Sequence, residues 1–137
     1  MQNSFEISTQ YLEWLKSFQR CVRELDYDGA EELHASNCIF SGTLTESSSS
    51  TKHYRIDQWE TVWPISREFE FLSVTGYRPM GSDCAMQLKW SNSSMIAGDW
   101  KNRKGIASFV LEGLEKPLAV MSHFSLTDTS RLSEGRW

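Results

Sequence analysis

Long apolar runs and basic clusters are both missing from this chain of 137 residues. No apolar stretch approaches the roughly 18 residues that a membrane-spanning helix needs. The net charge is −4, and the longest basic cluster is the short segment 101–104. The sequence therefore lacks the positive footprint that nucleic-acid binding normally requires. We expect neither a membrane nor a nucleic acid as its partner.

Cysteine is scarce, and its number is odd, because only Cys21, Cys38 and Cys84 are present. Each stands in an apolar pattern, which is typical of small buried side chains in a reducing compartment. The segment 1–10 is polar and has no basic stretch before an apolar run, unlike a signal peptide. These features predict a cytoplasmic location.

Sites for metals, phosphates and nucleophilic catalysis are also missing from the pattern. His34, His53 and His123 share no ligand spacing with one another or with the cysteines. There is no Gly-rich phosphate loop. No cysteine has the nearby base and electropositive setting that a nucleophile needs. We expect no metal and no cofactor.

Aromatic residues, by contrast, are abundant: they make up 12% of the chain and include six Trp. A chain of this length buries roughly two-thirds of its unfolded surface, enough for one domain without a disulfide or a metal. We therefore expect a single domain over residues 1–137, with its core in 5–127 and a polar tail at 128–137. Rings in this number either fill a core or line a cavity.

Three helices are predicted in the N-terminal half. Apolar residues recur at helical spacing over 6–25. A second, shorter helix is expected over 28–36, with Asp28 as its N-cap. A third helix is expected over 54–63, where Pro64 ends it.

The segment between the second and third helices is partly apolar and partly low in complexity. Residues 38–40 are predicted as a first strand, and the serine-rich stretch 41–52 as a surface loop, since it buries too little to offset its ordering entropy. This loop is either a plain connection or a lid at the mouth of a cavity.

The second half of the chain alternates apolar and polar residues, as strands do. A change of phase within 68–74 predicts a bulge or strong bend. A regular strand is expected at 84–90, then a polar connection at 92–102, and two apolar strands at 105–111 and 118–126. The class is therefore α+β, with helices packed on an antiparallel sheet.

The last two strands are apolar on both faces, so both faces must be covered. A turn centred near Leu114 places Phe109 and His123 on one face, and Ile106 and Phe124 on the other. We expect the face with Ile106 and Phe124 to meet the helices. The remaining outer face then suits a homodimer.

Two parts of the sequence resemble a known family. Residues 25–35, LDYDGAEELHA, and 38–42, CIFSG, resemble the helix-to-first-strand segment of SnoaL-like proteins, in the nuclear transport factor 2-like superfamily. Residues 103–111, RKGIASFVL, and 121–126, MSHFSL, resemble that family's two closing strands. The resemblance covers nearly the whole predicted core. It implies a dimeric, cone-shaped half-barrel, in which the helices pack on a strongly curved antiparallel sheet around a central pocket.

Members of that family include steroid isomerases, polyketide cyclases, dehydratases and proteins with no known chemistry, and the fold does not choose among them. The isomerases and cyclases rely on acidic residues or an Asp–His pair in the cavity. Here the strand segments expected to line it, 84–90, 106–110 and 118–124, contain no Asp or Glu. That departure argues against a pocket carboxylate as the catalytic base.

The candidate ligand-binding residues are rings and small hydroxyls that this fold brings around one cavity, a lining that suits a flat, mostly apolar ligand. They are Trp14, Tyr54, Trp59, Trp63, Trp90, Ser108 and Ser122. An ordinary core is the alternative for the rings. His123 is the candidate catalytic residue, because imidazole titrates near neutral pH; a buried histidine at the dimer face is its alternative. His34 is expected on a helix surface.

Three functions stay open. A cavity lined by rings and hydroxyls alone would favour binding of a small apolar molecule with no assignable reaction. A titratable side chain within reach of the ligand would favour an isomerase, cyclase or dehydratase acting on a hydrophobic carbonyl compound. A dry, fully packed interior would favour a dimeric interaction module.

Overall fold

The computed structural model describes residues 5–42, 49–51, 59–60 and 63–131. Helices α1 (Thr9–Glu24) and α2 (Tyr27–Glu32) open the chain. The remaining described elements are β1 (His34–Gly42), β2 (Ser49–Thr51), the 3-10 turn η1 (Trp63–Ile65), β3 (Ser66–Met80), β4 (Asp83–Ile96), β5 (Asp99–Glu112) and β6 (Leu118–Arg131). The third helix expected over 54–63 lies mostly outside the described residues.

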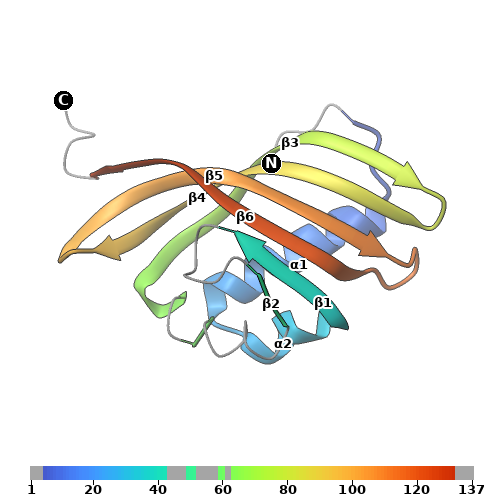
Figure 1. Cartoon of the computed structure of the whole chain (residues 1–137), viewed down its shortest axis with the longest axis horizontal. Helices are drawn as coiled ribbons and strands as arrows, with labels where there is room; N and C mark the ends of the chain where they lie inside the picture. Colours follow the sequence, from blue (N-terminus) through green and yellow to red (C-terminus); the bar gives the residue numbers. More distant parts are fainter. Residues whose placement is uncertain (1–4, 43–48, 52–58, 61–62, 132–137) are drawn as a thin grey trace.

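The strands form one curved, six-stranded sheet in the order β2-β1-β6-β5-β4-β3, and α1 packs against its concave face (Figure 1). The predicted α+β class is confirmed. The expectation of a purely antiparallel sheet needs one correction, because β1 and β6 pair in parallel. Parallel neighbours require a long crossover, and here the whole chain between β1 and β6 provides it. No helix in the described part is long and apolar enough to span a membrane.

Helix α1 follows the predicted apolar spacing and buries one face against the sheet. Its buried residues are Tyr11, Trp14, Leu15, Phe18, Cys21 and Val22. The helix ends at Glu24, and the capping residue Leu25 has a left-handed φ of 57°. The amide of Asp26 donates to the carbonyl of Cys21 at 2.8 Å, as in a Schellman-type termination.

Helix α2 starts earlier and is shorter than the sequence predicts. Its N-cap is Asp26, whose side chain accepts a hydrogen bond from the Gly29 amide at 2.9 Å. The expected cap, Asp28, lies in the first turn and is exposed. The helix ends at Glu32, and the chain enters β1 at His34. His34 is therefore a strand residue that is only 2% exposed, and the prediction of a helix-surface position is wrong.

Strand β3 bends where its apolar pattern changes phase. Its pairing with β4 shifts between Arg67 and Glu70 and again after Phe71. Glu68, inside the first irregularity, has a φ of 57°. The predicted bulge is confirmed, and it turns the start of β3 toward the C-terminal end of α1 (Figure 1).

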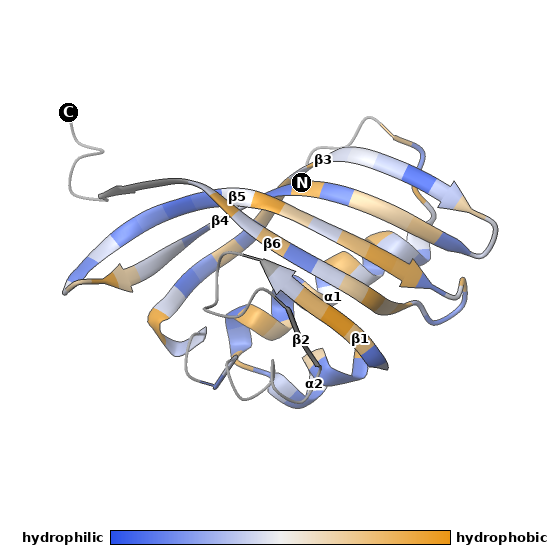
Figure 2. Cartoon of the chain, viewed as in Figure 1, coloured by the Kyte–Doolittle hydropathy of each residue, from blue (hydrophilic) through white to orange (hydrophobic). Residues whose placement is uncertain are grey.

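Residues 92–102, expected as a polar connection, form the ends of β4 and β5 with a tight turn between them. Ile96 pairs with Asp99, so the turn consists of Ala97 and Gly98. Their φ angles of 52° and 84° are those of a two-residue type I′ hairpin. This end of the sheet is largely hydrophilic (Figure 2), which explains why its sequence resembles a loop.

Strand β6 also runs further than predicted, to Arg131. The expected polar tail at 128–137 is thus a strand over its first four residues. Residues 132–137 lie outside the described part. The pairing of β6 with β5 supplies the backbone hydrogen bonds that a frayed tail would leave to water.

The register of β5 and β6 differs from the prediction. Val110 pairs with Met121 and Leu111 with Ala119, so Val120 is an extra residue in β6. One extra residue changes which face every later side chain occupies. Phe124 does face the helices, as expected, and the centroid of its ring lies 6.3 Å from that of Phe18. Ile106, which pairs with Ser125, lies on the outer face instead.

Candidate ligand-binding site

Aromatic rings fill the space between α1 and the concave face in the described part of the chain. Phe18 lies near the centre, with Phe71 at 6.2 Å and Phe109 at 6.0 Å between ring centroids. The rings that join this cluster are Trp14, Phe40, Trp59, Trp63, Phe69, Trp90 and Phe124. Many pairs are edge-to-face, the arrangement that ring quadrupoles favour. These rings form a core and, at its borders, the walls of a site.

His34 lies inside this aromatic cluster. Its Nδ1 is 2.7 Å from the carbonyl oxygen of Ala30. The rings of Trp14, Phe40 and Trp59 surround the imidazole at 5.1–5.8 Å. This position was not expected, because the second helix was predicted to extend over His34.

Few polar side chains are buried among the described residues. Those that are buried are His34, Asn92, Ser93, Ser94 and Ser122, and none is a carboxylate. Imidazole is the one side chain of this set that titrates near neutral pH.

The predicted tryptophans occupy three different settings. Trp14 is buried and donates its Nε1–H to the carbonyl of Leu33 at 2.9 Å. Trp59 and Trp63 stack on each other, with centroids 4.7 Å apart and an interplanar angle of 16°. Trp90 lies on the concave face and is fully buried. Tyr54 lies outside the described residues.

The predicted serines and His123 separate onto two faces. Ser122 is buried on the concave face opposite Phe109. Ser108 pairs with His123 on the outer face, so the structure corrects its predicted place in the pocket. His123 Nδ1 is 2.8 Å from Ser41 Oγ on β1. His123 therefore does not reach the interior.

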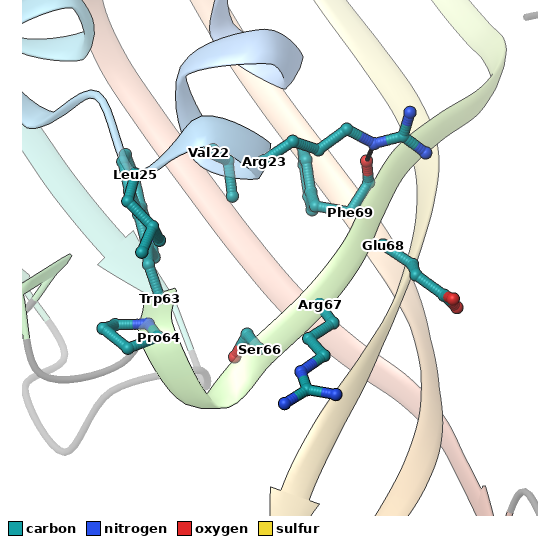
Figure 3. A pocket seen from close by; sticks show the side chains of 9 residues that line it. All are labelled: Val22, Arg23, Leu25, Trp63, Pro64, Ser66, Arg67, Glu68 and Phe69. Carbon is teal, nitrogen blue, oxygen red and sulfur yellow. Dashed lines mark hydrogen bonds between the residues drawn. The ribbon is translucent and has the colours of Figure 1, made fainter.

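A pocket of about 510 Å³ lies between the C-terminal end of α1 and the start of β3 (Figure 3). Its lining residues are Val22, Arg23, Leu25, Trp63, Pro64, Ser66, Arg67, Glu68 and Phe69. Leu25, Trp63 and Pro64 lie together on one side, and the charged ends of Arg67 and Glu68 point away from them (Figure 3). The other polar side chains of the lining are Ser66 and Arg23.

Hydrogen bonds of Arg23 and Ser66 connect the pocket with the neighbouring strands. Arg23 Nε donates to the carbonyl of Phe69 at 2.7 Å, which ties α1 to β3. Ser66 Oγ lies 3.3 Å from Ser94 Oγ, and Ser94 donates to Asn92 Oδ1 at 3.2 Å. A chain of polar groups thus leads from the pocket into the concave face of β4. This chain of polar groups was not expected, because residues 92–102 were predicted as a connection.

The three cysteines are buried and form no disulfide. Burial raises the pKa of the Cys84 thiol to about 11. Burial also raises the pKa of Cys21, although the nearby Arg20 acts in the opposite direction. Thiols with raised pKa values are poor nucleophiles near neutral pH. No group of three or more His, Cys, Asp or Glu side chains suited to a metal occurs among the described residues.

No family model and no curated protein matches the sequence, but many solved structures match the fold. A conserved protein from Planctomyces limnophilus gives a TM-score of 0.74 at 9% identity, over 86% of this chain and 94% of its own. An NTF2-like protein with a cystatin-like fold from Novosphingobium aromaticivorans gives 0.64 at 10% identity, over 87% and 80%. The chain has the NTF2-like fold.

A third similar structure is a subunit of an enzyme. The β subunit of benzoate 1,2-dioxygenase from Burkholderia mallei gives a TM-score of 0.68 at 12% identity, over 90% of this chain and 93% of its own. At such identities the likeness shows the NTF2-like fold alone. The predicted resemblance is confirmed at that level, and the SnoaL-like subgroup stays a prediction.

Proposed function

We propose that the protein binds a flat, mostly apolar small molecule at the junction of α1, η1 and the concave face. The observation that carries this proposal is the pocket of about 510 Å³ with its apolar side of Leu25, Trp63 and Pro64. Small-molecule sites in proteins have volumes of about 300–1,000 Å³ and are lined mainly by apolar and aromatic side chains, with few polar groups. The resemblance to SnoaL-like proteins supports the same reading.

One observation favours a catalytic form of this function, an isomerase, cyclase or dehydratase of a hydrophobic carbonyl compound. His34 is a buried imidazole surrounded by rings that continue to the pocket through Trp59 and Trp63. An imidazole can accept a proton at one nitrogen and donate one at the other. His34, rather than His123, is the side chain of the described part that this alternative would use as its acid–base group.

We further propose that two copies of the chain pair through the outer face of the sheet. Ile39 on β1 is 57% exposed, and it pairs with Met121 on β6. Ile106 and Val110 on β5 lie on the same outer face and are half-buried. An apolar face of this kind is typical of an interaction surface. The dioxygenase β subunit is a case in which the same fold serves as one part of a larger protein.

The neutral fluorescent probe N-phenyl-1-naphthylamine tests the binding function. We expect saturable binding to the wild-type chain, measured as an increase in probe fluorescence. Ser66→Phe places a ring in the pocket and should weaken probe binding at least tenfold. Ser82→Phe is the matched control, because Ser82 is exposed in the β3–β4 turn, away from the pocket. Absence of saturable binding, or equal affinities in the two variants, would overturn the proposal.

A further inference from the structure

The concave face changes from apolar to polar at Trp90. On β4, Leu88 and Trp90 are followed on the same face by Asn92 and Ser94. The pairing of β4 with β5 has no irregularity, so Arg103, the partner of Asn92, lies on this face too. The side chains that continue the core are therefore an amide, a hydroxyl and a guanidinium.

Trp90 has a hydrogen-bond donor with no acceptor in the described part of the chain. The side chain is 0% exposed, and its Nε1 has no partner there. Gly105 on β5 pairs with Trp90, and a Cβ on Gly105 would lie 2.7 Å from Cε2, the ring atom that carries Nε1. The N–H edge of the indole therefore lies over β5. Leaving a buried donor unsatisfied is unfavourable, so a missing acceptor is the expected explanation.

Arg103 is the second unpartnered donor, two residues before Gly105 on β5. Its Nε is buried and has no hydrogen-bond partner among the side chains that the structure describes. Burial lowers the pKa of Arg103 from its ordinary value, since it desolvates the charge. A half-buried cation normally has an anionic or hydrogen-bonding partner.

The neighbours of these two groups suit an acceptor that carries negative charge. Asn92 already uses its Oδ1 to accept from Ser94, which leaves its amide N–H₂ as a further donor. Lys101, two residues along β5, adds a second positive charge on the same face. The acidic Glu68 lies elsewhere, because it accepts from Ser93 on the opposite face.

We propose that Trp90, Asn92 and Arg103 form a subsite for a carboxylate group of the ligand. This inference rests on the proposed binding function, and it names the ligand class as flat, apolar carboxylic acids. Two contacts join the subsite to the pocket. The ring of Phe69, in the pocket wall, lies 6.3 Å from the ring of Trp90, and Ser66 bonds to Ser94.

The donor set fits the planar shape of a carboxylate. A planar guanidinium matches the two oxygens of a carboxylate. The indole and amide donors add hydrogen bonds without adding charge.

A pair of ligands with the same shape tests this subsite by displacement of N-phenyl-1-naphthylamine. The two competitors are 2-naphthoate and 2-naphthamide, which differ in the charge of one group. We expect 2-naphthoate to displace the probe from the wild-type chain at least tenfold more effectively. Arg103→Gln should remove that preference, whereas Lys104→Gln, on the outer face one residue away, should keep it. Trp90→Phe retains a ring and removes the donor, so it should reduce the preference.

The outcomes separate the two proposals. Equal displacement by both compounds from the wild-type chain would overturn the carboxylate subsite and leave the binding function intact. A preference that survives Arg103→Gln would also overturn it. If the probe itself shows no saturable binding, the proposed function fails. The wild-type comparison needs no variant, so a variant that folds poorly does not weaken the test.

Discussion

Gly105 illustrates how a single residue can set the geometry of the site. Its Cα lies so close to the Trp90 ring and to the Ser125 carbonyl that no side chain fits there. The indole can lie over β5 only because this position is glycine. The placement of the Trp90 donor, and with it the proposed subsite, depends on that contact.

Substitution of Gly105 therefore has a clear expected cost. Gly105→Ala forces a methyl group into backbone and ring atoms, and overpacking of this kind costs about 1–3 kcal/mol. Gly76→Ala is the matched control, because its Cβ would meet the Gln87 Cβ at an ordinary 3.6 Å. Urea denaturation should show a lower free energy of unfolding for Gly105→Ala and little change for Gly76→Ala. Equal values for the two variants would contradict this packing.

The N-cap of α2 gives a second prediction for single residues. Asp26→Ala removes the acceptor for the Gly29 amide, and loss of an N-cap costs about 1 kcal/mol. Asp26→Asn keeps an acceptor and should retain most of the stability. Asp28→Ala should cost less than Asp26→Ala in the same urea experiment. If Asp28→Ala has the larger effect, the cap is at Asp28 after all.

The individual site residues were predictable only where a local pattern marks burial. Trp14 stands at helical spacing with other apolar residues, so its place in the interior follows from the sequence. His34 and Arg103 carry no such mark. Arg103 stands between two polar residues and His34 at the junction of α2 and β1, so their inward direction follows from where β1 starts and from how β4 pairs with β5.

The β4–β5 hairpin is the element that carries the proposed subsite. Its tight turn depends on Ala97 and Gly98, which are both left-handed. A left-handed conformation costs an ordinary L-residue roughly 1–2 kcal/mol, and Asn tolerates it better than other side chains.

Substitutions at Ala97 test this turn. Ala97→Asn should raise the free energy of unfolding by about 0.5 kcal/mol, and Ala97→Val should lower it by about 1 kcal/mol. Both side chains are exposed at this position, so burial does not confound the comparison. Thermal denaturation of the two variants measures the difference. A more stable Val variant would show that the turn has another conformation.

The elements also differ in how far the sequence determines them. The bulge in β3 was predictable because the apolar pattern changes phase within the strand. The bulge in β6 was not predictable, because Val120 and its neighbours are apolar on both faces of the strand. The sequence there shows no alternation whose phase could change. The register of β5 and β6 therefore could not be predicted from alternation alone, and Ser108 was assigned to the wrong face.

For the whole molecule, the apolar outer face of the sheet leads us to expect self-association. Sedimentation velocity should show a dimer of the wild-type chain, and Ile39→Asp should shift it toward the monomer, because it places a charge on this face. Ile65→Asp is the matched control, since Ile65 is 47% exposed in η1, outside the sheet. Dimers that persist equally in both variants would mean that the outer face is not the interface.

A substitution at His123 distinguishes self-association from ligand binding. Its Nδ1 lies 2.8 Å from Ser41 Oγ on the outer face. His123→Ala should therefore weaken the dimer and leave the affinity for N-phenyl-1-naphthylamine unchanged. Loss of probe binding with an unchanged dimer constant would place His123 in the pocket.

The architecture of the whole molecule was more predictable than its function. The order of helices and strands, and the resemblance of 25–42 and 103–126, were sufficient for the NTF2-like fold. The ligand was not predictable, because the polar groups that would select it come from strands whose pairing the sequence does not reveal.

The central claim is that this chain holds a flat, mostly apolar molecule. Native mass spectrometry of the protein purified from its own host tests it most directly. We expect a mass excess over the bare chain that disappears on denaturation, and a released compound with an apolar ring system and a carboxyl group. Chains with the mass of the polypeptide alone would contradict the claim and favour an interaction module.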